Sequence, residues 1–298
     1  MELAYSSLYG SMYRGTVEDF LDSSACKEFV GKVQLIFTSP PFPLNRKKKY
    51  GNKAGDEYIT WLSGLASKLK KLLKPSGSIV IEIGNAWEPG SPTMSTLALE
   101  TLLQFKKKAR LHLIEQFIAY NPARLPGPAQ WVNVERIRVK DAFTHLWWMA
   151  PSTKPNANNR NVLVPYSDSM RKLLETGQYN SGKRPSEHHI GENSFKSNNG
   201  GAIPSNVLIV SNTSSNDPYQ DYCRRNGLLT HPARMPKELP SFFIKFLTEP
   251  GDIVLDPFAG SNTTGSVAEV LQRRWVSIEQ DSGYVEGSKG RFSPEVKV

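Results

Sequence analysis

The sequence predicts an α/β fold in which a mostly parallel sheet carries helices on both faces. Short apolar runs typical of buried strands alternate with longer segments in which apolar residues recur at helical spacing. Proline- or glycine-rich breakers separate many of these segments. The chain has 298 residues, 39% of them hydrophobic, which suits one large domain or one domain with a substantial insertion.

The first half of the chain alternates predicted strands and helices. The run QLIFT at 34–38 is β-branched and aromatic, and it ends at prolines that cannot continue a central strand. Apolar residues at helical spacing predict a helix over 58–73 that stops at the breaker KPSG. A strand at 78–83, a helix at 97–108 and strands at 112–119 and 142–149 follow. We assign Trp147 and Trp148 of the last strand to the core.

The second half opens with a polar tract rich in Asn, Ser and Gly. Long irregular tracts of this kind in compact domains are usually functional loops or disorder. Short apolar pieces within it, NVLV and NVLIV, favour a small loop-rich lobe. Regular pattern returns with a helix at 239–247, a strand at 252–255, a helix at 263–271 and a strand at 274–278. We therefore divide the chain at 1–150, 151–230 and 231–298.

Charge and cysteine content restrict the class of protein. Lys and Arg number 37 against 28 Asp and Glu, a net charge of +9, which favours an anionic partner and above all nucleic acid. Cys26 and Cys223 are far apart and support neither a disulfide framework nor a zinc site. The N-terminus does not resemble a secretory signal, and no apolar run has the length of a membrane helix. We expect a soluble, cytoplasmic protein.

The stretch DIVLDPFAGSNTTG at 252–265 is the most informative one. A buried strand ends in Asp256, and glycines then punctuate the turn into a helix whose N-terminus suits an anion. Asn262 and Thr263 can cap that helix. Glu279 ends the next strand, where nucleotide-binding α/β proteins place the acid that binds ribose hydroxyls. The stretch matches neither a Walker loop nor GxGxxG, and a Gly-rich structural turn is the simpler alternative.

The end of the strand at 34–38 raises a second question. Ser39, Pro40, Pro41 and Phe42 stop the strand, and the basic cluster Arg46–Lys49 follows. A strand-ending turn followed by a solvated loop is one interpretation. The other is a site that holds a flat polar ring beside a polyanion.

Taken together, these two stretches resemble S-adenosylmethionine-dependent DNA amino-methyltransferases. DPFAGSNTTG resembles their cofactor loop, D-x-F-x-G-x-x-x-T, and TSPPF their catalytic loop, [S/N/D]-P-P-[Y/F/W]. The catalytic loop comes first, as in the circularly permuted group called β. Further segments, among them YNPARLPGP, WVNVERIRVKDA, RPSEHHIG and HPARMP, resemble PvuII-type cytosine-N4 methyltransferases. The resemblance implies a Rossmann-like methyltransferase sheet, with 151–230 as the target-recognition region.

The resemblance assigns cofactor-binding residues motif by motif. The loop and helix start would hold the methionine part of S-adenosylmethionine, Glu279 the ribose, and the N-terminal stretch the adenine. The residues are Tyr13, Gly15, Thr16, Thr38, His231, Pro232, Asp256, Pro257, Phe258, Gly260, Asn262, Thr263 and Glu279. The family usually has Asp where this chain has Thr16, so Glu18 or Asp19 would have to replace that contact. No metal ion is expected.

The resemblance also implies a mechanism. The Ser39 hydroxyl and the Pro40 carbonyl would accept the hydrogens of the target amine, Pro41 would stiffen the loop, and Phe42 would stack on the flipped base. Neither cysteine follows a proline as in cytosine-C5 enzymes. Ser39 favours cytosine-N4 over adenine-N6 methylation. A DNA-binding relative that has lost catalysis is a rival hypothesis, whereas the polar tract and the basic balance disfavour an RNA or small-molecule methyltransferase.

Double-stranded DNA is the expected partner of this chain. Arg46, Lys47 and Lys48 would contact phosphates, and Arg184, Ser186 and His188 would read base edges, with a solvated loop as the simpler alternative for each. The PvuII-type resemblance adds a cognate restriction endonuclease as functional partner. It also implies a nucleoid-associated bacterial protein, which we expect to act as a monomer.

Overall fold

The computed structural model describes residues 1–43, 53, 55–178, 182–183, 185–186, 189–190, 195–211 and 217–292. The chain divides into two compact units, one formed by residues 1–157 with 206–298 and the other by residues 158–205. None of the helices in the described ranges is long and apolar enough to cross a membrane.

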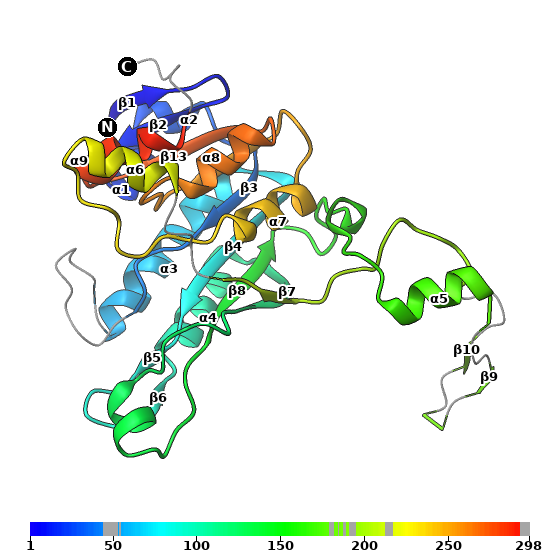
Figure 1. Cartoon of the computed structure of the whole chain (residues 1–298). Coiled ribbons are helices and arrows are strands. Elements are labelled where there is room, and N and C mark those ends of the chain that lie inside the picture. The colour runs from blue at the N-terminus through cyan, green and yellow to red at the C-terminus, as the bar shows by residue number, and fades with distance from the viewer. Residues whose placement is uncertain are drawn as a thin grey trace. The chain divides into compact units, whose positions relative to one another are not determined.

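A sheet of nine strands forms the centre of the larger unit, counted over the described residues (Figure 1). The spatial order of its strands is β1 (Glu2–Ser6), β2 (Gly10–Arg14), β13 (Arg274–Glu279), β12 (Ile253–Asp256), β3 (Val33–Thr38), β4 (Leu73–Gly84), β8 (Phe143–Ala150), β7 (His112–Tyr120) and β11 (Val207–Ile209). Neighbours from β2 to β4 run parallel, whereas β8 runs antiparallel to both β4 and β7. The carboxyl ends of the five parallel strands therefore meet at one edge.

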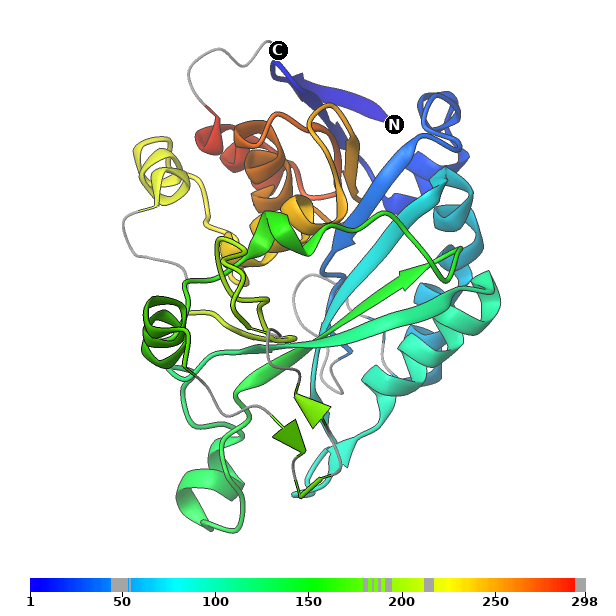
Figure 2. The same cartoon turned by 90° about the vertical axis from the view of Figure 1, so that its right-hand side faces the viewer.

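Helices cover both faces of this sheet (Figure 2). One face packs against α1 (Val17–Asp22), α2 (Ser24–Lys27), α3 (Gly55–Leu72) and α4 (Leu97–Ala109). The other packs against α7 (Glu238–Leu247), α8 (Thr263–Val270) and α9 (Ser282–Ser288). Successive residues of β3 alternate between the two cores, with Ile36 in the first and Leu35 and Phe37 in the second. This double burial explains why the central strands read as continuous apolar runs.

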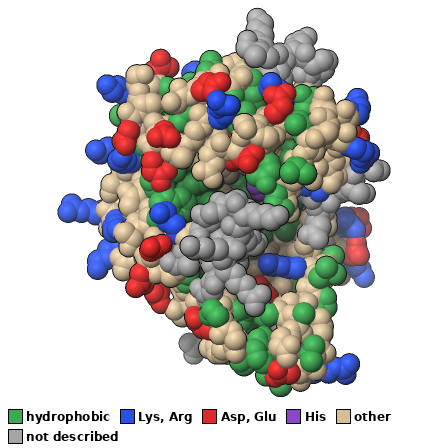
Figure 3. Space-filling model, turned by 90° about the vertical axis from the view of Figure 1, so that its left-hand side faces the viewer, with side chains coloured by type: hydrophobic (Ala, Val, Ile, Leu, Met, Phe, Trp, Pro, Cys, Tyr) green, Lys and Arg blue, Asp and Glu red, His purple; other side chains and the backbone are tan. Residues whose placement is uncertain are grey.

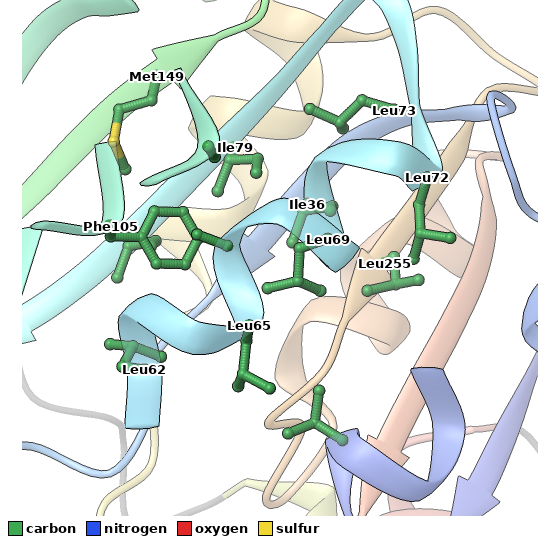
Figure 4. Packing of buried hydrophobic residues seen from close by; sticks show 14 of the residues in the cluster. Ile36, Leu62, Leu65, Leu69, Leu72, Leu73, Ile79, Phe105, Met149 and Leu255 are labelled. Atoms are coloured by element: carbon green, nitrogen blue, oxygen red, sulfur yellow. The ribbon is translucent and has the colours of Figure 1, made fainter. Parts of the chain in front are cut away.

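The amphipathic helix α3 shows how the first core is packed. Leu62, Leu65, Leu69 and Leu72 recur at helical spacing and are almost completely buried. Figure 4 shows these leucines beside Ile36 and Ile79 of the sheet and Phe105 of α4. Lys70 and Lys71 lie in the last turn, where cations favour the negative end of the helix dipole.

The predicted α/β fold with helices on both faces of the sheet is confirmed. Each strand and helix predicted from 34 to 149 and from 239 to 278 has a counterpart, and Trp147 and Trp148 are buried. The strands β1 and β2, α1, α2, α9 and α6 (Pro218–Arg225) were not predicted. The apolar piece NVLIV, assigned to the polar lobe, instead supplies β11 of the main sheet.

Two hairpin-like extensions complete the larger unit. The short strands β5 (Ala86–Trp87) and β6 (Met94–Ser95) pair beyond the end of β4, and the π-helical turn η1 (Gln130–Val134) lies between β7 and β8. A 3-10 turn, η3 (Lys289–Arg291), follows α9.

The smaller unit, residues 158–205, has little regular structure. It contains the 3-10 turn η2 (Asn159–Val162), helix α5 (Asp168–Thr176) and the short antiparallel pair β9 (Gly182–Lys183) and β10 (His189–Ile190). An isolated bridge joins Val164 to Ala202. Ser167 caps the N-terminus of α5, and none of the residues of α5 is buried.

Candidate active site

A buried carboxylate joins the carboxyl ends of β3 and β12. Asp256 is 3% exposed and accepts hydrogen bonds from Thr38 Oγ1 at 2.7 Å, Thr264 Oγ1 at 2.6 Å and the Phe258 backbone N–H at 3.1 Å. Burial raises the pKa of this carboxyl, and the three hydrogen bonds oppose that rise. Asp256 therefore holds the loop before α8 against the end of β3.

The loop turns sharply at Gly260. Its φ of +52° is in the left-handed region, and a Cβ placed there would lie 3.0 Å from His231 Nε2. The Gly260 N–H donates to Glu279 Oε2 at 2.8 Å, while Glu279 Oε1 accepts from the Asp281 N–H at 2.9 Å. Burial raises the pKa of Glu279. Glu279 as a residue is intermediate in exposure at the end of β13.

Asn262 shapes this turn from inside the protein. It is the N-cap of α8, with Oδ1 accepting from the Gly265 N–H at 3.1 Å and from Ser277 Oγ at 2.7 Å. Its Nδ2 donates to Tyr5 Oη at 3.1 Å, and the residue is completely buried. The predicted capping by Asn262 is present. Asn262, Thr263 and Pro257 are all buried, so they shape the loop from within.

His231 lies against the loop from the other side. Its backbone N–H donates to Tyr219 Oη at 2.8 Å, and its ring centroid lies 4.5 Å from that of Tyr284. Burial lowers the pKa of its imidazole. The neighbouring Pro232 is exposed.

Arg291 ties the same loop to α6. Its guanidinium donates to the Ser261 carbonyl and hydroxyl at 2.5 and 2.9 Å and to Asp217 at 3.2 Å. It also lies over the ring of Tyr219, 4.7 Å from the centroid.

The N-terminal stretch reaches the same place. Strand β2 pairs with β13 from Gly10 to Arg14, so Tyr13 comes alongside Ile278, and the Gly15 N–H donates to the Glu279 carbonyl at 3.0 Å. Thr16 forms a capping box with Asp19 at the start of α1. Segments that are far apart in sequence therefore meet at one edge of the sheet.

The two acids that could replace the missing family contact have different surroundings. Asp19 accepts from the backbone N–H and hydroxyl of Thr16. Glu18 instead accepts from Trp61 Nε1 at 2.6 Å, and Trp61 packs edge-on against Phe258 of the loop at 5.5 Å. Of the two, Glu18 is the one linked to the candidate cofactor loop.

The Ser39–Phe42 loop lies at the ends of β3 and β4. The Ser39 hydroxyl is hydrogen-bonded to the carboxylate of Glu82, which also accepts from Thr144 Oγ1 at 2.8 Å. Glu82 is 8% exposed, and burial raises its pKa. A Cβ on Gly84 would lie 2.5 Å from the Phe42 ring, so glycine permits the ring to rest on β4. Pro40 is buried and Pro41 is partly exposed.

Glu82 was not identified from the sequence because SIVIEI was assigned as a buried strand. Its signal was available: it is the one acid in an otherwise apolar run that ends beside the Ser39 loop. A buried acid next to a reactive loop is a candidate functional group.

The predicted DNA-contacting residues are only partly described. Arg46, Lys47, Lys48, Arg184 and His188 lie outside the described residues. Ser186 is exposed in the smaller unit. Among the residues that the structure describes, no group of three or more His, Cys, Asp or Glu could hold a metal ion.

The fold and the two loops define a class of protein. The family model for DNA methylases matches residues 33–290, and the chain belongs to this family. The chain is 44% identical over 97% of its length to the type II methyltransferase M.PvuII of Proteus hauseri, covering 85% of that protein. It is 25% identical over 85% of its length to M.BglII of Bacillus subtilis, covering 62% of that protein.

Solved structures agree with this assignment. The cytosine-N4-specific PvuII DNA methyltransferase superposes with a TM-score of 0.78 at 37% identity, covering 99% of this chain and 90% of that one. The complex of M1.HpyAVI with S-adenosylmethionine shares the fold, with a TM-score of 0.56 at 20% identity over 95% of this chain and 98% of that one.

Proposed function

We propose that this protein is a site-specific DNA methyltransferase that transfers a methyl group from S-adenosylmethionine to the exocyclic N4 amine of cytosine in double-stranded DNA. Its similarity to M.PvuII, a type II methyltransferase, supports a role in protecting host DNA beside a cognate restriction endonuclease. The observation that carries the proposal is Ser39, hydrogen-bonded to buried Glu82 at the strand edge where Asp256 holds the second loop.

The pocket suits S-adenosylmethionine, which would supply a methyl group bonded to a positively charged sulfur. The N-terminus of α8 and the tight turn at Gly260 suit the carboxylate of its methionine part. The carboxylate of Glu279, a residue of intermediate exposure, suits ribose hydroxyls, and the Tyr13–Thr16 stretch with Phe258 suits the adenine. Glu18 takes the place of the acid that the family has at position 16, because its partner Trp61 contacts Phe258.

The Ser39–Glu82 pair handles a proton in this mechanism. An exocyclic amine that gains a methyl group must lose one hydrogen as a proton. Ser39 Oγ accepts that proton while its own hydrogen passes to Glu82, whose raised pKa makes the carboxylate a better acceptor. Thr144 fixes the carboxylate from β8. The Pro40 carbonyl orients the second amine hydrogen, and Phe42, resting on Gly84, stacks on the extruded base.

The smaller unit is the candidate reader of the target sequence. We assign target recognition to residues 158–205, within the 151–230 tract, because this unit is compact by itself and carries exposed Ser186. Arg184 and His188 belong to the same stretch of sequence, and Arg46, Lys47 and Lys48 remain assigned to phosphate contacts.

A methyl-transfer assay followed by nucleoside analysis tests the proposal. Purified protein and labelled S-adenosylmethionine should convert duplex DNA to a product containing N4-methylcytosine. N6-methyladenine as the sole product would contradict the assignment of the target base, and cofactor binding without turnover would indicate a catalytically impaired relative. A methylation map of DNA from expressing cells would then give the recognition sequence.

A further inference from the structure

Exposed apolar side chains lie on the connection between β7 and β8, near the end of β4 on which Phe42 rests. The segment 121–142 between β7 and β8, which we call the rim segment, carries large apolar side chains with exposed fractions of 83% (Leu125), 69% (Val134), 60% (Ile137) and 87% (Val139). Figure 3 shows apolar side chains gathered at the lower end of the molecule, where Figure 1 places β5, β6 and the turn between β7 and β8. Apolar side chains concentrated in this way usually mark a contact surface.

The sheet register places the rim segment next to the catalytic loop. Tyr120 pairs with Phe143 across β7 and β8, and the next residue, Thr144, pairs with Gly84 at the end of β4. Phe42 rests on Gly84, and Thr144 hydrogen-bonds Glu82. The rim segment therefore ends at β8, the neighbour of β4, and Phe42, which rests on β4, is the residue proposed to stack on the extruded base.

A polar network around the buried side chains of Asn85 and His145 holds the base of the rim segment. Asn85 Nδ2 donates to Asp141 at 2.8 Å, so its Oδ1 accepts from His145 Nε2 at 3.0 Å, and Gln116 Nε2 donates to His145 Nδ1 at 3.1 Å. These donor and acceptor roles require a neutral His145 imidazole. Burial lowers the pKa of His145 and so favours that neutral form. Asp141 lies at the end of the rim segment and Gln116 lies within β7, so the network ties the rim segment to the sheet.

Further contacts stiffen the rest of the segment. The Arg138 guanidinium lies 3.9 Å from the ring centroid of Trp87 on β5. Lys140 Nζ donates to the Pro122 carbonyl at 2.7 Å, and the Ile137 N–H donates to the Trp131 carbonyl at 3.0 Å. The apolar side chains are therefore presented by a fixed surface.

The charge of the rim segment favours a nucleic acid as its partner. Between residues 121 and 142 there are four cations, Arg124, Arg136, Arg138 and Lys140, and two acids, Glu135 and Asp141. Asp141 is already bound to Asn85, whereas Arg136 is exposed next to Val134 and Ile137. Proteins that open a base step place apolar side chains against the bases and cations on the neighbouring phosphates. The rim segment carries both kinds of side chain.

We propose that the rim segment contacts the DNA duplex beside the extruded cytosine, with Val134, Ile137 and Val139 against the opened base step and Arg136 on a flanking phosphate. The inference rests on the proposed function, because a base enters the pocket only if the duplex lies across this edge. It adds a DNA contact outside residues 158–205.

The double variant Ile137→Ser with Val139→Ser tests the apolar contact, with Leu8→Ser as the matched control. Leu8 is 82% exposed in the β1–β2 turn, so both variants remove exposed apolar surface. Binding to a duplex containing the mapped site is measured by fluorescence anisotropy, and base extrusion by 2-aminopurine at the target position. We expect about tenfold weaker binding and reduced 2-aminopurine fluorescence for the double variant, with S-adenosylmethionine affinity unchanged.

Other outcomes decide against the inference. Duplex affinity and 2-aminopurine fluorescence equal to those of the control would overturn it. If wild-type protein is a dimer and the double variant is a monomer with the same DNA affinity, the rim segment is covered by a second copy of the chain and not by DNA. Arg136→Gln should lower the slope of log affinity against log salt by about 1. If wild-type protein yields no methylated product, the result that would refute the proposed function, the same binding comparison is made with a duplex selected by affinity from a random-sequence pool, so the inference is still tested.

Discussion

Asp256 and Glu82 are both buried carboxyls at the carboxyl edge of one parallel sheet, yet their partners differ. Asp256 receives the hydroxyls of Thr38 in β3 and Thr264 in α8 and the backbone N–H of Phe258 in the loop between β12 and α8. Glu82 receives the hydroxyl of Thr144, within the sheet, and the hydroxyl of Ser39, in the loop that would face the target amine. Burial raises the pKa of both.

The difference shows that burial alone does not define the role of an acid. The donors of Asp256 join β3, β12 and α8, so losing its charge should loosen the pocket. Ser39, the other donor to Glu82, would pass a proton from the target amine to this carboxylate, so losing the charge of Glu82 should slow the chemical step.

Glu82→Gln should have the largest effect. The amide keeps the size of the side chain but cannot take a proton from Ser39, so the single-turnover rate of methyl transfer should fall about a hundredfold or more. Affinity for S-adenosylmethionine, measured by calorimetry, should not change. Thr144→Val, which removes only the other hydrogen-bond donor to Glu82, is the matched control and should lower the single-turnover rate by about tenfold or less. Equal rates for Glu82→Gln and wild type would remove Glu82 from the mechanism.

Asp256→Asn should act on the pocket instead. The amide N–H₂ cannot accept from the threonine hydroxyls, which leaves a buried donor unpaired and costs about 1–3 kcal/mol in the free energy of unfolding. We expect a lower Tm by differential scanning calorimetry and about tenfold weaker cofactor binding, with a nearly normal single-turnover rate at saturating cofactor. A large loss of rate at saturation with an unchanged Tm would reverse the roles assigned to the two acids.

The pH dependence provides the smallest but most selective test. Because burial places the folded-state pKa of Glu82 above the ordinary glutamate value of 4.5, the single-turnover rate should fall as pH decreases through that raised pKa. The same shift means that Glu82 favours the folded state most below its unfolded pKa, and that this stability is lost as pH rises through the folded pKa. Glu82→Gln should lack both dependences. An identical acidic limb in that variant would assign the titration to another group.

Local pattern was sufficient for the central strands of the sheet and for its long helices. The apolar cores of QLIFT and DIVL, Leu35–Phe37 and Ile253–Leu255, are buried on both faces of the sheet, and each run ends close to a proline. Strand β2, with the sequence GSMYR, has a weak pattern of its own and forms by pairing with β13 near the other end of the chain. Pairing over such a distance cannot be predicted from the residues nearby.

The same limit applied to the site. The loops at Ser39 and Asp256 could be predicted because each follows a buried strand and matches a family motif. The contact of Thr144 with Glu82, and that of His231 with Gly260, depend on which strands and loops become neighbours. The prediction for Asn262 combined capping with cofactor contact, and in the fold its amide makes three hydrogen bonds inside the protein.

The pairing of β2 with β13 also has a consequence for synthesis on the ribosome. Residues 10–14 emerge early, but their partner strand, residues 274–279, emerges near the end of translation. At ordinary elongation rates this delay is on the order of tens of seconds. During that time the pocket around Glu279 does not exist, so the nascent chain cannot bind the cofactor.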